Sequence, residues 1–191
     1  MRTKNTVNRC RPGFGASCSF CCGSHNYVLS ENDIEEIFIK RGNDSKALKG
    51  QSPCKISLNS PQTEVHPEDF FEEKLIKDGM QCRYIGFSDY DHTLLCCLIY
   101  SEDHKGKIYE SFFSGTCRNF MCAAWDELTD REVLFAAELM KDWYYYSLLV
   151  NSPEIVKKLY AEYNAPEEIS EDIIEELKIE LRNRLLEEDM I

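Results

Sequence analysis

The chain has 191 residues, enough for one sizeable hydrophobic core, and its 34 acidic against 22 basic side chains give a net charge of −12. Such an acidic surface repels phosphate, so nucleic acid is not an expected partner. No apolar run is as long as a membrane span, and the first nine residues lack the apolar stretch of an export signal. We therefore expect a cytoplasmic protein with no membrane partner.

The ten cysteines are the most informative feature of the composition. In a reducing cytoplasm clustered thiols are more often metal ligands than disulfides, whereas a secreted chain with this even count would favour disulfides. The densest cluster is Cys18-Ser19-Phe20-Cys21-Cys22, which has Cys10 ahead of it and glycines on both sides. A Cys-x-x-Cys step in a tight turn points two thiolates at one ion, so we expect a metal site here.

The next part of the chain predicts a helix followed by a loop. Ser30 is a good N-cap for a helix over residues 31–41, and Gly42 is expected to end it. Residues 42–68 carry glycines and prolines among polar residues, which is typical of a loop. A short strand over 55–58 and a helix over 67–77 are the elements we expect in and after this loop.

Strands are predicted from Cys82 onward, because aromatic and β-branched residues there alternate with turn-like segments. The expected strands cover residues 83–87, 93–100 and 107–113. We expect them to form an antiparallel meander that holds cysteines at its ends.

The remainder of the chain predicts helices. Thr129-Asp130-Arg131-Glu132 is a capping box for a helix to about Val150, with an apolar face that would cover the sheet. Ser152-Pro153 begins a second helix that ends near Tyr163. A third follows Pro166, and its apolar stripe consists of Ile169, Ile173, Leu177, Leu181 and Leu185, widened by Ile174 and Leu186. The prediction is thus an α+β fold, with a metal domain over residues 1–127 and a helical segment over 128–191 packed on it.

Thiolates select zinc or iron–sulfur clusters over calcium or magnesium. Adjacent side chains diverge, so one cysteine of each pair, Cys21-Cys22 and Cys96-Cys97, is expected to bind a given ion. Together the expected ligands are Cys10, Cys18, Cys21, Cys22, Cys82, Cys97, Cys117 and Cys122. His25 is an alternative ligand beside the cluster, since mixed Cys/His sites occur. Arg118 follows Cys117 directly and is either a donor to the thiolates or a surface arginine.

The order of these cysteines resembles the zinc- or iron-chelating family named for its CxxCxxCC motif, which includes the flagellin lysine N-methylases. The matching pieces, spread over residues 10–122, are Cys18-x-x-Cys21-Cys22, Leu29-Ser30-Glu31-Asn32-Asp33, Cys82, Cys97-Leu98-Ile99-Tyr100 and Cys117-Arg118-Asn119-Phe120-Met121-Cys122. Gly15 stands where the first cysteine of the motif would fall, and Cys10 is the candidate to replace it. The resemblance implies zinc or an iron–sulfur cluster, of the four-iron four-sulfur type in the methylase members.

The expected function is therefore metal binding through cysteine thiolates, with an iron–sulfur cluster favoured over zinc. One alternative is a cluster-dependent protein (lysine) methylase-like enzyme, which rests on the resemblance alone because the sequence has no glycine-rich nucleotide signature. Another is a structural zinc module that offers its acidic C-terminal helix to a protein partner.

Overall fold

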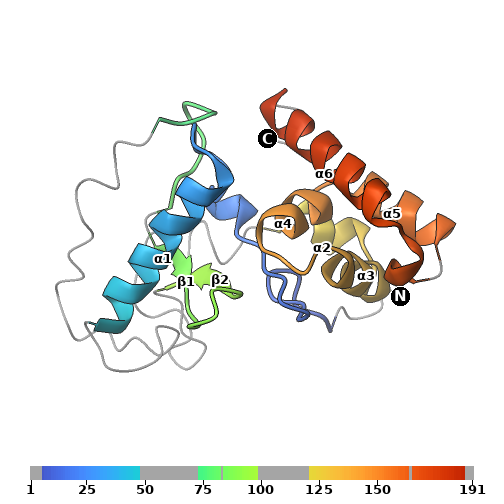
Figure 1. Cartoon of the computed structure of the whole chain (residues 1–191), viewed down its shortest axis with the longest axis horizontal. Coiled ribbons are helices and arrows are strands. Elements are labelled where there is room, and N and C mark those ends of the chain that lie inside the picture. Colours follow the sequence, from blue (N-terminus) through green and yellow to red (C-terminus); the bar gives the residue numbers. More distant parts are fainter. Residues whose placement is uncertain (1–5, 48–72, 83, 99–120, 164, 188–191) are drawn as a thin grey trace. The chain divides into compact units, whose positions relative to one another are not determined.

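The computed structural model describes residues 6–47, 73–82, 84–98, 121–163 and 165–187 (Figure 1). This described part is mostly helical, with one two-stranded antiparallel sheet, so the expected short antiparallel sheet and the expected C-terminal helices are both present. In chain order the elements are η1 (Phe20–Cys22), α1 (Glu31–Ala47), β1 (Ile85–Phe87), β2 (Leu95–Cys97), α2 (Ala123–Glu127), α3 (Asp130–Met140), α4 (Tyr144–Val150), α5 (Pro153–Glu162), η6 (Pro166–Glu168) and α6 (Glu171–Leu186). Among the described helices, none is both long and apolar enough to span a membrane.

The chain divides into two compact units. Unit 1 consists of Met1–Cys21 together with Met121–Ile191, and unit 2 is the intervening segment Cys22–Phe120. The boundary that we expected after residue 127 falls inside unit 1, between α2 and α3. Unit 1 therefore joins the first cysteines of the chain to its C-terminal helices.

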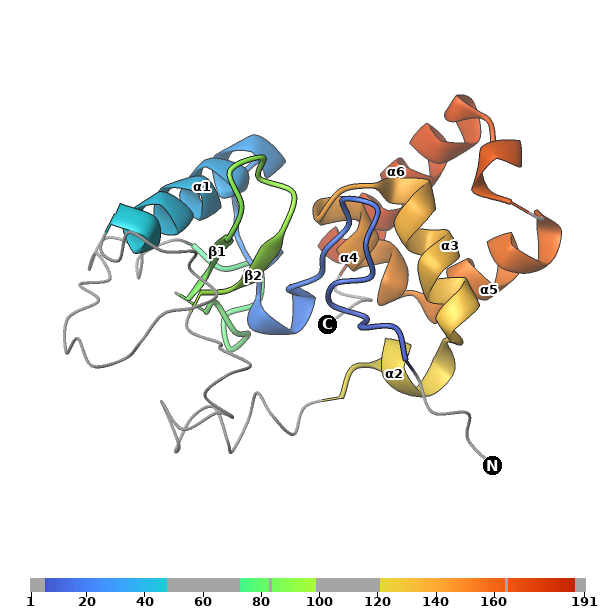
Figure 2. The same cartoon turned by 90° about the horizontal axis from the view of Figure 1, so that it is seen from below.

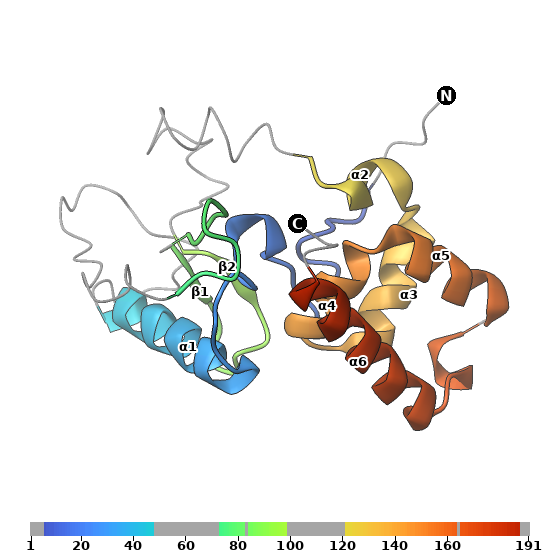
Figure 3. The same ribbon diagram turned by 90° about the horizontal axis from the view of Figure 1, so that it is seen from above.

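In unit 2, helix α1 packs against the sheet (Figure 3). Ser30 caps it as expected, because its Oγ accepts from the Asp33 N–H at 3.3 Å. The predicted end at Gly42 is wrong, since the helix continues to Ala47. A Cβ on Gly42 would lie 2.2 Å from the carbonyl oxygen of Phe87 in β1, so this glycine permits close packing of helix and strand instead of ending the helix.

The two described strands are shorter than expected. Ile85, Gly86 and Phe87 pair antiparallel with Cys97, Cys96 and Leu95, respectively. The predicted strands over 55–58 and 107–113 lie outside the described residues. The predicted helix over 67–77 lies partly outside them, and its residues from Glu73 onward are not helical. The helix that covers the sheet is α1, a role that we had expected the C-terminal helices to fill.

In unit 1, α3, α4, α5 and α6 form a helical bundle (Figure 2). The capping box at Thr129 and Glu132 is present, with both reciprocal hydrogen bonds. The single helix expected from here to Val150 is wrong, because Lys141 adopts a left-handed conformation (φ 56°) that ends α3. Asp142 then accepts from the Tyr145 N–H at 2.6 Å, which starts α4 in a new direction.

Helices α5 and α6 confirm the rest of the helical prediction. Of the expected stripe, Ile169, Leu177, Leu181 and Leu185 are buried, whereas Leu186 is 66% exposed and does not widen it. Helix α6 packs on α4 and places most of its carboxylates in solvent. Helix α6 thus contributes buried side chains to the core of unit 1.

Candidate metal centre

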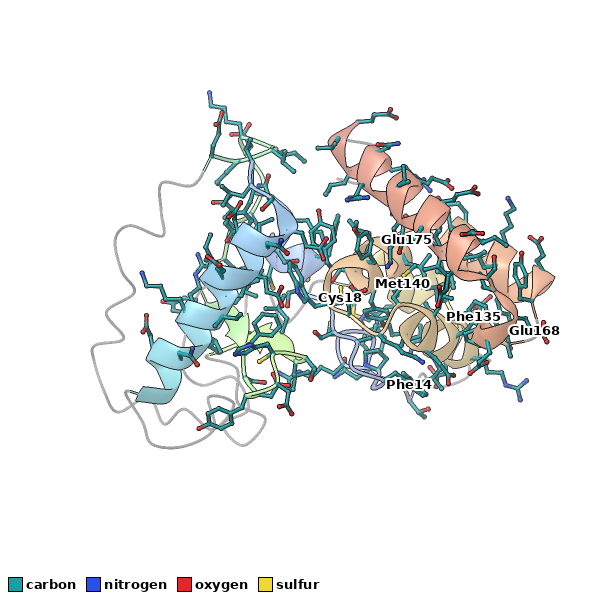
Figure 4. All side chains as sticks on the ribbon, in the orientation of Figure 1. Phe14, Cys18, Phe135, Met140, Glu168 and Glu175 are labelled. Carbon is teal, nitrogen blue, oxygen red and sulfur yellow. The ribbon has the colours of Figure 1, made fainter. Side chains whose placement is uncertain are left out.

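Four of the predicted ligands, Cys10, Cys18, Cys21 and Cys122, belong to unit 1. The backbone joins the first two, since the Cys18 N–H donates to the Cys10 carbonyl oxygen at 3.0 Å. Cys122 is the residue that precedes α2, so it comes from the second segment of the unit, Met121–Ile191. In Figure 4, Cys18 lies in the N-terminal segment beside α4, with other sulfurs in the same unit. The four thiols therefore come from three separated segments of sequence.

A tight turn between Cys10 and Cys18 reverses the chain. Its central residues Gly13, Phe14 and Gly15 all have positive φ (105°, 58° and 77°), and the Ala16 N–H donates to the Gly13 carbonyl oxygen at 3.0 Å. Phe14, labelled in Figure 4, is 48% exposed in this turn. At Gly15 a Cβ would lie 3.3 Å from the Lys141 carbonyl oxygen, so the turn packs closely against the break between α3 and α4.

Arg9 and Asp130 attach the segment ahead of Cys10 to the helices. The Arg9 side chain is 1% exposed in spite of its charge, and its Nη1 lies 2.6 Å from the Asp130 Oδ1. The same carboxylate accepts from the Thr6 N–H at 2.8 Å and from the Thr6 hydroxyl at 2.6 Å. These bonds hold the Asp130 pKa well below its usual range, so the carboxylate is charged at neutral pH.

Helix α4 places polar groups beneath the thiols. The Tyr146 hydroxyl donates to the Arg9 carbonyl oxygen at 2.7 Å, and Asn151 Nδ2 lies 3.7 Å from the Cys18 sulfur. Ser147 is fully buried, and its hydroxyl donates to the Trp143 carbonyl oxygen at 2.6 Å. Burial raises the pKa of Tyr146 far above its usual range, and Cys18, Cys10 and Cys122 raise it further by repulsion. The tyrosine is therefore a neutral hydrogen-bond donor in this site.

The thiols are held in an environment that disfavours their charged form. Burial raises the pKa of Cys10 to about 12, with added repulsion from Cys21 and Cys122, while Arg11 acts in the opposite direction. Burial also raises the pKa of Cys18 strongly, and repulsion by Cys10 and Cys21 adds to it. The charges of these thiols, taken as thiolates, thus act directly on one another.

Backbone N–H groups partly oppose this effect at two of the sulfurs. The pKa of Cys122 is raised by burial and by Cys21, but hydrogen bonds from the N–H groups of Trp125 and Ala124 lower it. The Phe20 N–H does the same for Cys18. Two thiols that lie far apart in sequence therefore each face backbone donors that stabilise a thiolate.

The other predicted ligands are placed elsewhere or not described. Cys22 and Cys82 meet in unit 2, where the Cys82 N–H donates to the Cys22 carbonyl oxygen at 2.9 Å. Cys97 lies in β2 of the same unit, and its neighbour Cys96 is buried. Cys117 and Arg118 lie outside the described residues. His25 is 2% exposed, and its Nδ1 lies 2.9 Å from the Ser24 hydroxyl.

Within the described residues, no group of three or more His, Cys, Asp or Glu side chains already stands in an arrangement that could hold a metal ion. The sequence indicated the thiols but not Arg9, Tyr146, Ser147 or Asn151. Only the place of Arg9 directly before Cys10 was a local signal, since the other three join the site through tertiary packing. Comparison with models of protein families, with curated proteins and with solved structures found no match.

Proposed function

We propose that unit 1 binds a metal centre, an iron–sulfur cluster or a zinc ion, through Cys10, Cys18, Cys21 and Cys122. The observation that carries the proposal is that these four thiols belong to one unit, where a 3.0 Å backbone hydrogen bond joins Cys18 to Cys10 and Asn151 Nδ2 lies 3.7 Å from the Cys18 sulfur. The effect of Cys21 and Cys122 on the pKa of Cys10 agrees with this grouping. Four thiolates in one place are unfavourable without a cation, and a soft cation is the ligand that thiolates prefer. Four cysteines are also a complete donor set for tetrahedral zinc or for a four-iron four-sulfur cluster.

The donors around the sulfurs support the same function. Hydrogen bonds from backbone N–H groups reach Cys18 and Cys122, and Asn151 approaches the Cys18 sulfur. Such donors stabilise thiolate ligands and orient them, and in iron–sulfur proteins they tune the reduction potential. In this proposal α3–α6 cover a small cysteine-liganded centre. This is the arrangement of metal domain and C-terminal helices that the sequence predicted.

The four remaining predicted ligands, Cys22, Cys82, Cys97 and Cys117, stay predictions, as does the methylase-like activity that the resemblance implies. The resemblance to the CxxCxxCC family supports an iron–sulfur cluster. A closed structural zinc site is the alternative, and the two differ in colour and in iron content.

The test is metal content and the visible absorption spectrum of protein purified without oxygen. An iron–sulfur cluster gives iron, acid-labile sulfide and broad visible absorption, whereas zinc gives a colourless protein. Replacing Cys10, Cys18, Cys21 or Cys122 singly by Ser should lower the metal content, because each variant removes one of four donors. Cys54→Ser is the matched control, since Cys54 lies outside the motif, and it should retain the metal.

A second comparison separates unit 1 from unit 2. Because the four cysteines of unit 1 are a complete set, Cys97→Ser should keep the stoichiometry of the metal. Equal metal loss in the Cys54 control, or full metal content in all four variants of unit 1, would contradict the proposal.

A further inference from the structure

Among the described residues of unit 1, Arg9 is the most completely buried charged one, at 1% exposure, and it lies next to a proposed ligand. Building on the proposed metal site, we propose that Arg9 and Asp130 are positioning residues that bring Cys10 to Cys122 before any metal binds. Neither side chain is needed as a ligand in this role. Their effect is to fix the position of the backbone beside Cys10 and Cys122, and thereby the position of the two sulfurs.

The guanidinium of Arg9 contacts carbonyl groups of α2 and of its C-cap residue, Leu128. Its Nη2 donates to the Leu128 carbonyl oxygen at 2.8 Å, and its Nε makes a longer contact of 3.5 Å with the carbonyl oxygen of Ala124. The guanidinium carbon lies 4.9 Å from the centre of the Trp125 ring. Because α2 begins directly after Cys122, these contacts fix the segment beside Cys10 to the element beside Cys122.

Asp130 completes the attachment from the first turn of α3. Its Oδ1 accepts from Arg9 Nη1, and its Oδ2 accepts from the N–H groups of Thr6 and Val7, at 2.8 and 3.3 Å. Arg9 Nη1 also donates to the Val7 carbonyl oxygen at 2.7 Å, which folds the segment onto its own side chain. The two residues are 121 positions apart in sequence, so this attachment joins two distant parts of the chain.

The pattern of donors requires arginine. A planar guanidinium offers five N–H donors in fixed directions, and here they meet three carbonyl oxygens and one carboxylate. A lysine ammonium would keep the charge and the attraction to Asp130, but it has no planar fork of donors that could also meet the carbonyl oxygens of Ala124 and Leu128. Tyr146 fixes the carbonyl group of Arg9 itself, through the 2.7 Å hydrogen bond from its hydroxyl. The peptide that leads into Cys10 is thus held at both its side chain and its backbone.

Two variants test this role, Arg9→Lys and Asp130→Asn, with Arg184→Ala as the control. Arg184 forms an ion pair with Glu154 at 2.6 Å on the surface of the same unit, away from the thiols in sequence. The first measurement uses metal-free, reduced protein and a short thiol cross-linker such as dibromobimane. The yield of the Cys10–Cys122 cross-linked peptide is determined by mass spectrometry. The second measurement is the affinity for Zn²⁺, by competition with a chelator.

We expect both variants to keep their helical circular dichroism, to form less of the Cys10–Cys122 cross-link and to bind Zn²⁺ roughly 10–100-fold more weakly, a typical cost of losing a supporting residue. Arg184→Ala should match the original protein in both measurements. Folded variants with an unchanged cross-link yield would overturn the positioning role. Unfolded variants would overturn it too, since Arg9 and Asp130 would then be required for folding itself.

The cross-link also separates this inference from the proposed function. If the original protein binds no metal but its cross-link still depends on Arg9, the metal site is wrong and the positioning role stands. If the original protein binds metal and the folded variants form as much cross-link as it does, the metal site stands and the positioning role is wrong.

Discussion

The exposure of the four thiols of unit 1 is unequal, and this matters for how a metal would reach them. Cys21 is exposed, whereas Cys10, Cys18 and Cys122 are half-buried. An incoming ion would therefore meet Cys21 first and acquire the others by exchange. Each of the three half-buried thiols must lose its proton in that step, so metal binding is coupled to proton release.

This coupling gives opposite pH dependences for the metal-free and the metal-loaded protein. In the metal-free form the pKa of Cys10 is raised from 9.0 to about 12, so the folded state keeps its proton where the unfolded chain has lost it. The contribution to stability is present below pH 9 and is lost as the pH rises towards 12. In the metal-loaded form the folded state holds thiolates, so its stability should instead increase as the pH rises towards 9.

Urea unfolding over this pH range, with and without metal, measures both slopes. Cys10→Ser should reduce the alkaline loss of the metal-free protein, because the group that titrates differently in the two states is gone. If this variant loses as much stability at alkaline pH as the original protein, groups other than Cys10 cause the loss.

At the scale of elements, the sequence predicted the starts of helices better than their ends. Ser30 and Thr129 cap α1 and α3 as expected, because an N-cap acts on N–H groups two or three residues away. Gly42 and Lys141 misled the prediction in opposite directions. A glycine that usually ends a helix serves helix–strand packing here, and a lysine that usually continues one adopts a left-handed conformation. Both outcomes depend on neighbours that are distant in sequence.

Helix α6 provides a prediction of its own. Leu181 is fully buried in the bundle, whereas Leu186, later on the same helix, is 66% exposed. Leu181→Ala should lower the free energy of unfolding by about 2–5 kcal/mol, since it removes buried methyl groups and leaves a cavity. Leu186→Ala is the matched control and should change it by less than about 0.5 kcal/mol.

Denaturant unfolding of the two variants measures the difference. Equal effects would mean that α6 is not anchored through its leucine stripe. That the exposed carboxylates of α6 form a surface for a protein partner stays a prediction, and the control substitution leaves them in place.

At the scale of the whole molecule, local spacing predicted the Cys18–Cys21 step but not its full surroundings. A Cys-x-x-Cys step is recognisable because four consecutive residues fix its geometry. Cys122 was among the expected ligands because of its place in the order of the cysteines, whereas the Arg9–Asp130 ion pair near it could not be predicted. Polar groups from α4 could not be anticipated, because nothing in their local sequence differs from an ordinary buried helix.

Removing the metal should affect the two halves of unit 1 differently. The N-terminal segment has few buried apolar side chains, so sulfur–metal bonds should supply much of its order between Cys10 and Cys21. Helices α3 and α6 have their own N-caps, and all four helices α3–α6 have buried faces. We expect amide exchange between Cys10 and Cys21 to accelerate in metal-free, reduced protein, while exchange in α3–α6 changes little.

Hydrogen exchange followed by mass spectrometry measures this directly. Unchanged protection between Cys10 and Cys21 after metal removal would show that the metal does not hold the segment. Loss of protection throughout α3–α6 would show instead that the whole unit depends on it.

The division of unit 1 between the two ends of the chain has a consequence during biosynthesis. Cys10, Cys18 and Cys21 leave the ribosome about 100 residues ahead of Cys122. At synthesis rates of roughly 5–20 residues per second, they wait about 5–20 s for the fourth sulfur. Unit 2 is continuous in sequence, so it can fold on the nascent chain while unit 1 is still incomplete. A metal ion offered to the nascent chain would therefore meet three of the four proposed ligands and exchange readily, and lasting insertion would follow translation of the C-terminal helices.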